Sequence, residues 1–247
     1  MSTPVRLMLA DAGEAADLAA FLVRLLRFDR AAAVRLQAVR SAGSGGAEAV
    51  AEPESGAAAS GSGVLAVFGR LPLGSSGALA IRTARLAELG GPADLTVSAG
   101  QLLESVDEQA NTVLVPAAVT GPAWAGLLPP RTGWRLLAEP PAFEVFPELM
   151  AAVREFKERS GAVPEHHRTR SVLDGLADEI WSRPLTAAPE LPLRAVHAAY
   201  VMGFLRPAVP LTVHGAGAWL RLSAPAGSVA VRSAAAPGAG LGLSPLR

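Results

Sequence analysis

The stretch VRLQA, from Val34 to Ala38, alternates apolar and polar side chains with a period of two. This spacing predicts a β-strand with one covered face. The preceding segment, Gly13–Phe28, carries leucines and a phenylalanine at helical spacing, which predicts an amphipathic helix. Two further apolar segments, Val64–Phe68 and Leu79–Ile81, flank a turn rich in proline and glycine. The first part of the chain is therefore predicted to be a helix with an antiparallel meander.

Low complexity marks the segment Ser41–Gly63, which contains almost only alanine, glycine, serine, glutamate and proline. Such a composition buries too little apolar surface to offset the entropy of ordering the chain, so we predict a disordered insert. In the Pro- and Gly-rich segment Gly121–Pro141, we expect an ordered loop anchored by Trp124 and Trp134. Between the meander and this loop, the sequence predicts a strand, a short helix and a buried strand at Leu95–Ala99, Gly100–Asp107 and Thr112–Val119.

The second half of the chain predicts three helices and three short strands. The first helix is expected to begin at Pro147, where a missing N–H costs nothing. Ser171 with Asp174 is predicted to cap the second helix, and Pro192 to open a third that ends at Pro207. The predicted strands are Leu211–Val213, Ala218–Leu222 and Ser228–Val231.

Together these elements predict an α+β fold. An N-terminal helix with an antiparallel sheet is followed by a helical half that ends in a small antiparallel sheet. We place the first half at residues 1–140, with the disordered insert at 41–63. The three helices and the small sheet occupy residues 141–233, and residues 234–247 are predicted to be a flexible tail.

Composition excludes several classes of function. The 22 basic side chains are balanced by 22 acidic ones, so the chain lacks the strong positive field that favours binding to nucleic acid or anionic membranes. The absence of cysteine excludes disulfides, thiolate nucleophiles and iron–sulfur clusters. No apolar run approaches the roughly 18 residues of a membrane span, and the N-terminus has no signal-peptide pattern. We therefore expect a cytoplasmic protein with no membrane partner, in which any binding to nucleic acid rests on a local basic patch.

Residues that often carry chemistry are present but form no recognised motif. His166 and His167 are adjacent, so their side chains point apart on a helix, and Glu165 beside them completes no zinc pattern. His197 is interpreted as a core residue and His214 as a loop residue. Ser98 has no partner that the sequence identifies, and no nucleophile elbow or phosphate-binding loop occurs. The close carboxylates Glu104, Asp107 and Glu108 are interpreted as a solvated face. The sequence thus predicts no catalytic residue, no cofactor and no metal site, and an enzyme of unknown class is kept as an alternative.

A local basic cluster is the main candidate for binding. It lies on the predicted helices of the second half, with His166 and His167 between its members. One interpretation is a DNA-binding module of the winged-helix kind, which predicts salt-sensitive binding that Arg168→Glu with Arg170→Glu destroys. Interleaved carboxylates and the long connection from Trp181 to Leu193 favour a solvated or protein-binding face instead. The cluster comprises Arg154, Lys157, Arg159, Arg168, Arg170 and Arg183, and all of these except Lys157 are predicted to contact a partner.

Two segments carry a resemblance to a known family. DLTVSAGQLLESVD, Asp94–Asp107, and VLVPAAVTGPAWAGLLPPRTGW, Val113–Trp134, resemble segments of the actinobacterial signature proteins, a family restricted to that phylum. The resemblance implies a protein without enzyme activity. For one branch of the family, it implies a role in chromosome segregation and cell division, through control of polymerisation by the Walker-type partition ATPase. No catalytic residues are carried over.

Our leading hypothesis is therefore a non-enzymatic regulatory or adaptor protein that binds a cytoplasmic protein partner. The partition ATPase is the partner that the resemblance implies. Such a protein can shift assembly by binding subunits better than filaments. Self-association is a further expectation, because amphipathic helices and sheet edges are commonly buried between identical subunits. The DNA-binding module and the enzyme of unknown class remain the alternatives.

Overall fold

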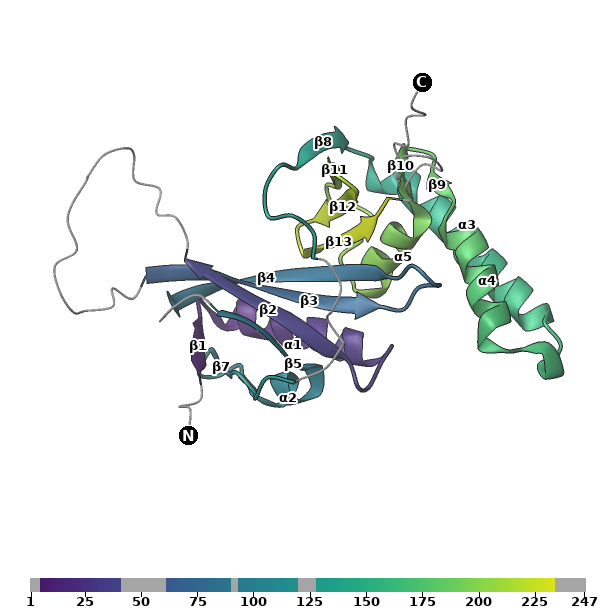
Figure 1. Cartoon of the computed structure of the whole chain (residues 1–247). Helices are drawn as coiled ribbons and strands as arrows, with labels where there is room; N and C mark the ends of the chain where they lie inside the picture. Colours follow the sequence, from purple (N-terminus) through teal and green to yellow (C-terminus); the bar gives the residue numbers. More distant parts are fainter. Residues whose placement is uncertain (1–4, 41–60, 90–92, 120–127, 234–247) are drawn as a thin grey trace, which may run out of the picture. The chain divides into compact units, whose positions relative to one another are not determined.

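The computed structural model describes residues 5–40, 61–89, 93–119 and 128–233 (Figure 1). The fold is α+β, as the sequence predicts, and combines helices with antiparallel strands. The chain forms two compact units. Residues 1–69 and 81–126 make up unit 1, and residues 70–80 and 127–247 make up unit 2.

In unit 1, helix α1 (Ala12–Leu26) accompanies an antiparallel sheet. Asp11 begins the helix, since its carboxylate accepts a hydrogen bond of 3.0 Å from the backbone N–H of Glu14. The sheet contains the strands β5 (Ala93–Ser98), β2 (Ala33–Arg40), β3 (Gly61–Leu71) and β4 (Ala78–Leu89), in that spatial order. On β2 the residues Val34, Leu36 and Ala38 are buried while Arg35 and Gln37 are not, which confirms the prediction from VRLQA.

Shorter elements complete unit 1. Strand β1 (Arg6–Leu9), which the sequence did not predict, pairs with both β4 and β7 (Thr112–Leu114). Strand β6 (Val106–Asp107) pairs with β7, and helix α2 (Ala99–Glu104) follows β5. The strand predicted at Thr112–Val119 is shorter in the structure. Among residues 115–119, an isolated bridge between Ala118 and Val97 links the chain to β5, and the N–H of Val119 donates a 2.9 Å hydrogen bond to the carbonyl oxygen of Thr96.

The predicted insert at 41–63 is partly wrong. Gly61–Gly63 already belong to strand β3, where Gly63 pairs with Arg40. The ladder between β2 and β3 runs further than their apolar patterns indicate, because backbone hydrogen bonds do not require apolar side chains. The rest of the insert, the predicted anchor Trp124 and the predicted tail at 234–247 lie outside the described residues.

Unit 2 contains the helical half. Its helices are α3 (Ala142–Ala162), α4 (Arg170–Trp181) and α5 (Leu193–Val201), with the 3-10 turn η2 (Glu165–His167) between α3 and α4. The strands β13 (Gly227–Arg232), β12 (Trp219–Ala224), β11 (Thr212–Ala216) and β8 (Arg135–Ala138) form the sheet in that order. The predicted helical half followed by antiparallel strands is confirmed. Strands β9 (Pro184–Leu185) and β10 (Ala188–Pro192) form a separate two-stranded sheet.

The border between the units differs from the predicted division at residue 140. Strand β8 pairs with β11, with Ala138 opposite Val213, so residues 127–140 lie in unit 2. The tip of the β3–β4 hairpin also lies there, where the backbone N–H of Ser75 donates a 2.9 Å hydrogen bond to Asp178. Composition places the border inside a long Pro- and Gly-rich loop, but only strand pairing shows which side of the loop belongs to which unit.

Three predicted helix ends are corrected. α3 begins at Ala142, so Pro147 lies inside the helix rather than at its start. α4 is capped by Thr169, which accepts a 3.3 Å hydrogen bond from the N–H of Val172, and not by Ser171. α5 ends at Val201 well before Pro207, because Gly203, with φ +73°, reverses the chain.

Candidate functional site

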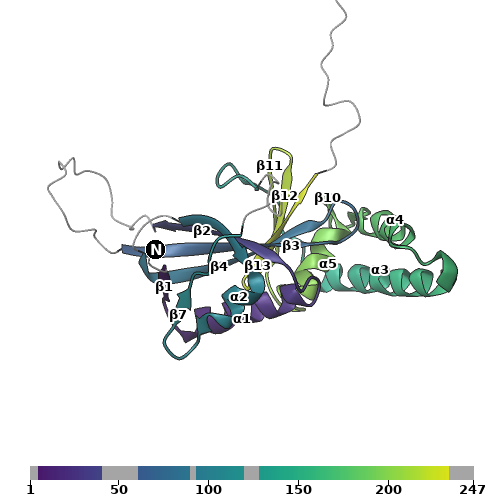
Figure 2. The same ribbon diagram turned by 60° about the horizontal axis from the view of Figure 1, so that its bottom comes forward.

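Helices α3 and α4 lie side by side and form the α3–α4 hairpin, which extends away from strands β11–β13 of the same unit (Figure 2). At its base the hairpin is apolar. Val145, Leu149 and Ala152 on α3 are buried, as are Ile180 and Trp181 on α4. No residue from Val153 to Leu176 is buried. We call residues 153–176 the outer half of the hairpin.

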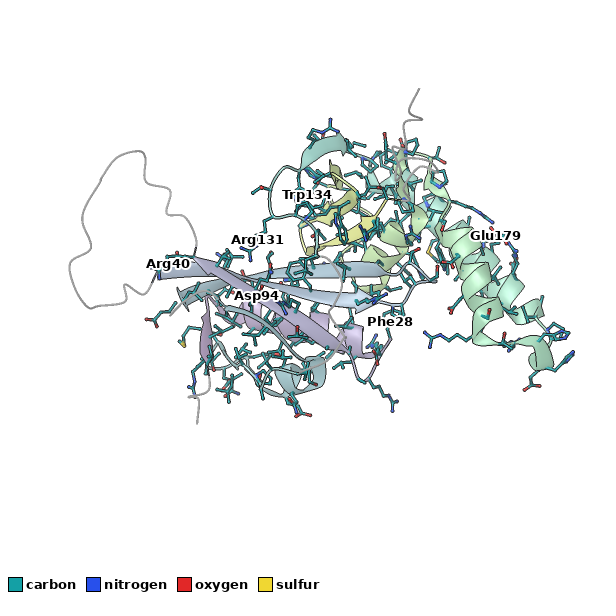
Figure 3. All side chains as sticks on the ribbon, viewed as in Figure 1. Phe28, Arg40, Asp94, Arg131, Trp134 and Glu179 are labelled. Atoms are coloured by element: carbon teal, nitrogen blue, oxygen red, sulfur yellow. The ribbon has the colours of Figure 1, made fainter. Side chains whose placement is uncertain are left out.

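Ion pairs join α3 to the C-terminal end of α4 and to Arg183, which follows it. Both terminal nitrogens of Arg183 donate to the carboxylate of Glu155, at 2.6 and 2.7 Å. Both terminal nitrogens of Arg159 donate to Glu179 at 2.7 Å, and one of them also reaches Glu155 at 3.1 Å. Glu179 is labelled on α4 in Figure 3. Paired guanidinium and carboxylate groups of this geometry form strong, directional contacts.

This network shifts the ionisation of its members. Hydrogen bonds from Arg183 and Arg159 lower the pKa of Glu155 to about 2. Arg159 likewise lowers the pKa of Glu179, and the pKa of Arg183 is raised, mainly by Glu155. All four groups are therefore charged at neutral pH. Two of the predicted partner-binding arginines, Arg159 and Arg183, thus fasten the hairpin itself.

The other predicted binding residues lie apart from this network. Arg168 donates to the carbonyl oxygens of Gly161 at 3.1 Å and Val163 at 3.2 Å, and so satisfies free acceptors at the end of α3. Arg170 begins α4 and lies 3.5 Å from Asp174, with 87% of its side chain exposed. Arg154 is exposed on α3. The cluster predicted from sequence therefore separates into arginines that fasten the hairpin or its turn and the more exposed Arg154 and Arg170, a difference that sequence spacing alone does not show.

An open groove of about 680 Å³ lies where the two helices of the hairpin meet. We call it the tip groove. Ala162, Val163, Pro164 and Val172 give it an apolar surface, and Thr169, Arg159, His166 and His167 complete the lining. The rings of the two histidines lie 4.1 Å apart, centroid to centroid. Sequence reasoning named the basic residues here but not the apolar ones, because the groove exists only once the turn brings residues 162–164 against α4.

The other residues that the sequence analysis considered form contacts that stabilise the fold. Ser98 caps α2, accepting a hydrogen bond of 3.4 Å from the N–H of Gln101. Asp107 accepts hydrogen bonds from the N–H groups of Gln109 and Ala110, so it shapes a turn. His197 stacks on Trp181 with ring centroids 4.1 Å apart, and burial lowers its pKa to about 4. In the described part of the chain, no three histidine, aspartate or glutamate side chains gather as metal ligands would.

A second set of polar groups lies on and beside strands β8, β11 and β12. The interpretation of His214 as a loop residue is wrong, because His214 lies within β11. His214 lies opposite Arg221 in the strand ladder, and Arg221 stacks over the ring of Trp134 at 4.3 Å. Trp134 in turn donates a 2.8 Å hydrogen bond to the carbonyl oxygen of Pro130. Burial lowers the pKa of both His214 and Arg221. Only the register of two strands brings these residues together, so no linear motif announces them.

Two family models match the chain and meet near the border between the units, although residues 70–80 of unit 2 fall within the first match. The chain belongs to the family described as Domain of unknown function (DUF8010), whose model matches residues 2–126, half of the chain. A second model, Domain of unknown function (DUF8185), matches residues 129–236. Neither the curated proteins nor the solved structures yield a match. Among the described residues, none of the helices is both long enough and apolar enough to cross a lipid bilayer.

Proposed function

We propose that this protein is a non-enzymatic cytoplasmic adaptor that binds another protein through the tip groove. The observation that supports this function is an open apolar groove at the end of a hairpin that its own ion pairs hold in shape. Val172 is 44% exposed and lines this groove together with Ala162, Val163 and Pro164, so it belongs to a contiguous apolar surface that a partner can cover.

The rim of the groove indicates the chemistry of the partner. Within the lining, Arg159 is engaged by Glu179, and His166 and His167 add polar groups. Arg170, which follows the lining residue Thr169 in the chain, is 87% exposed and adds positive charge at the start of α4. A matching segment presents one or two apolar side chains to the groove and carboxylates to the rim. Charge complementarity of this kind favours the right partner and speeds association.

The partition ATPase is the first partner to test. Its choice rests on the resemblance of Asp94–Asp107 and Val113–Trp134 to actinobacterial signature proteins. An adaptor that binds ATPase subunits more tightly than ATPase filaments lowers the amount of filament, because a ligand shifts an equilibrium by its differential affinity. The proposed role is therefore control of polymerisation during chromosome segregation and cell division.

The experiment uses the purified full-length protein and the partition ATPase of the same organism. Binding is measured by biolayer interferometry, and polymer by pelleting in the presence of ATP. We expect saturable binding and less pelleted ATPase. The variant Val172→Glu should weaken binding at least tenfold. It places a carboxylate on the apolar surface of the groove, where the proposed partner segment brings apolar side chains and carboxylates of its own.

A matched control is available on α1, where Val23 is 41% exposed against 44% for Val172. The variant Val23→Glu should bind as the unmodified protein does. Equal affinity of Val172→Glu and Val23→Glu would remove the tip groove from the account. Absence of any binding to the ATPase, with DNA retained in its place, would favour the DNA-binding alternative.

A further inference from the structure

Helix α3 carries a stripe of large side chains that the hairpin does not use. Its members are separated by 3, 4, 4 and 3 residues, so at 3.6 residues per turn they share one face of the helix. This spacing reads the same in both directions about its central methionine. The α3 stripe consists of Phe143, Phe146, Met150, Arg154 and Lys157.

Four of the five residues of the α3 stripe are exposed. Phe143 is 70% exposed and Met150 is 38% exposed, and both cations are exposed as well. The face of α3 that packs within the unit is a different one, marked by the buried Val145 and Leu149. Phe146 is half-buried, because its ring meets the ring of Tyr200 edge to face at 6.2 Å.

Charge on the α3 stripe is unevenly distributed. Its N-terminal half is aromatic, and its C-terminal half ends in Arg154 and Lys157. Within the described part of the chain, neither cation forms an ion pair. The stripe itself contains no carboxylate. Glu148 and Glu155 contact residues 183–186, while Glu144 and the exposed Glu158 lie beside the stripe without an ion pair among the described residues.

We propose that the α3 stripe binds a second copy of this chain, with the two α3 helices antiparallel and crossing at Met150. Residue 150 is the midpoint of 143 and 157 and also of 146 and 154. Each Phe143 therefore faces Lys157 of the other copy, and each Phe146 faces Arg154 of the other copy. The two Met150 side chains meet on the two-fold axis, as an isologous interface requires.

Aromatic and basic positions are complementary when a second copy of α3 lies antiparallel to the first. This complementarity favours a second copy as the partner and the antiparallel orientation. A cation over an aromatic face is attracted by the ring, and the aliphatic stems of arginine and lysine cover apolar surface. A parallel pair would instead place Lys157 on Lys157 and Arg154 on Arg154, which like charges oppose. The contact is a small one, so we expect a dissociation constant on the order of 10 µM.

Cysteine cross-linking tests the contact and its direction, because the unmodified full-length chain contains no cysteine. In the antiparallel pair, two cysteines from Met150→Cys lie together and form a disulfide between copies. Two cysteines from Phe143→Cys lie about 20 Å apart, since seven residues of helix separate each from the axis. A mixture of Phe143→Cys with Lys157→Cys should cross-link, whereas neither variant alone should.

Sedimentation equilibrium of the full-length protein measures the same association without cross-links. Met150→Lys should weaken the dimer at least tenfold, because it places two ammonium groups on the axis, while Val172→Lys on α4 should leave it unchanged. A monomer at ten times the expected dissociation constant would overturn the proposal, as would cross-linking of Phe143→Cys alone. The partner test concerns Val172 in the tip groove, whereas the dimer test concerns Met150 on α3. A failure of partner binding therefore does not decide whether the protein dimerises.

Discussion

Helix α1 and the outer half of the α3–α4 hairpin are fixed by different forces. α1 spans 15 residues and buries an apolar face in the core of unit 1. No residue in the outer half of the hairpin is fully buried, although Phe156 packs against Trp181 with ring centroids 5.7 Å apart. Its residues Glu155 and Arg159 form guanidinium–carboxylate pairs with Arg183 and Glu179. Helix α1 is therefore part of a core, whereas the outer half of the hairpin leaves apolar and basic groups available to a partner. The buried residues of α1 are Ala15, Leu18, Phe21, Leu22 and Leu25.

The largest expected effect lies in α1. Phe21 is 1% exposed, so Phe21→Ala should lower the free energy of unfolding by about 3–5 kcal/mol through lost burial and the cavity that remains. Urea unfolding followed by circular dichroism measures this loss. A loss below about 1 kcal/mol would show that α1 is not fixed by its apolar face.

The apolar base of the hairpin should respond to acid. Burial lowers the pKa of His197 to about 4 from an ordinary value of 6.5, so the unfolded chain binds the proton more readily. Stability is therefore complete above pH 6.5 and falls as the pH drops toward 4, by about 3 kcal/mol at most. His197→Phe keeps a ring against Trp181 and should remove this pH dependence. Unfolding curves between pH 7 and pH 4 decide the point, and an unchanged slope in the variant would contradict it.

The ion pairs should control only the outer half of the hairpin. Glu155→Gln removes the charge that Arg183 and Arg159 share, so amide hydrogen exchange should speed up over residues 153–176 and not over α1. In the unmodified protein, high salt should have a similar effect, because it screens exposed charges.

A matched control for Glu155→Gln exists in unit 1. Asp94 accepts a 2.7 Å hydrogen bond from Arg35, and Asp94→Asn should leave exchange in the hairpin unchanged. Acid should affect the ion pairs in a lower pH range than it affects His197, because the pKa of Glu155 is about 2. The ion pairs should persist down to the usual range of a carboxyl and weaken as the pH falls from about 4.5 toward 2. Hairpin exchange rates that fail to rise in that window would contradict this assignment.

The smallest effect belongs to the α3 stripe. Phe143 has the same side chain as Phe21 but is 70% exposed, so Phe143→Ala should change the free energy of unfolding by less than about 0.5 kcal/mol. Both variants, Phe21→Ala and Phe143→Ala, are measured under conditions where the protein is a monomer. Because the same side chain is removed in each, the difference between the two losses in unfolding free energy reports the effect of burial. A loss as large as that of Phe21→Ala would mean that Phe143 is part of the core.

Elements with a clear period could be predicted from the sequence. The helix at Gly13–Phe28, the strand containing VRLQA and the three C-terminal strands all occur close to their predicted positions. Strands β1 and β8 have only four residues each, too few to show a period, and they exist because partners lie beside them. The helix start placed at Pro147 was wrong because proline's preference for the first turn was outweighed by the packing of Ala142 and Val145.

The candidate site was less predictable than the fold. The basic residues of the second half were visible as a composition, and the helices that carry them were expected. Their partners were not, since Glu155 and Arg183 lie 28 residues apart and meet only when α3 and α4 pack together. The apolar side of the tip groove depends in the same way on the turn at Glu165–His167.

Hydrogen exchange of the full-length protein with and without a saturating amount of the partition ATPase tests the central claim most directly. The account predicts slower exchange over residues 159–172, which line the tip groove, and no change in α1. Protection that appears on α1 alone, or no protection anywhere in the chain, would contradict the account.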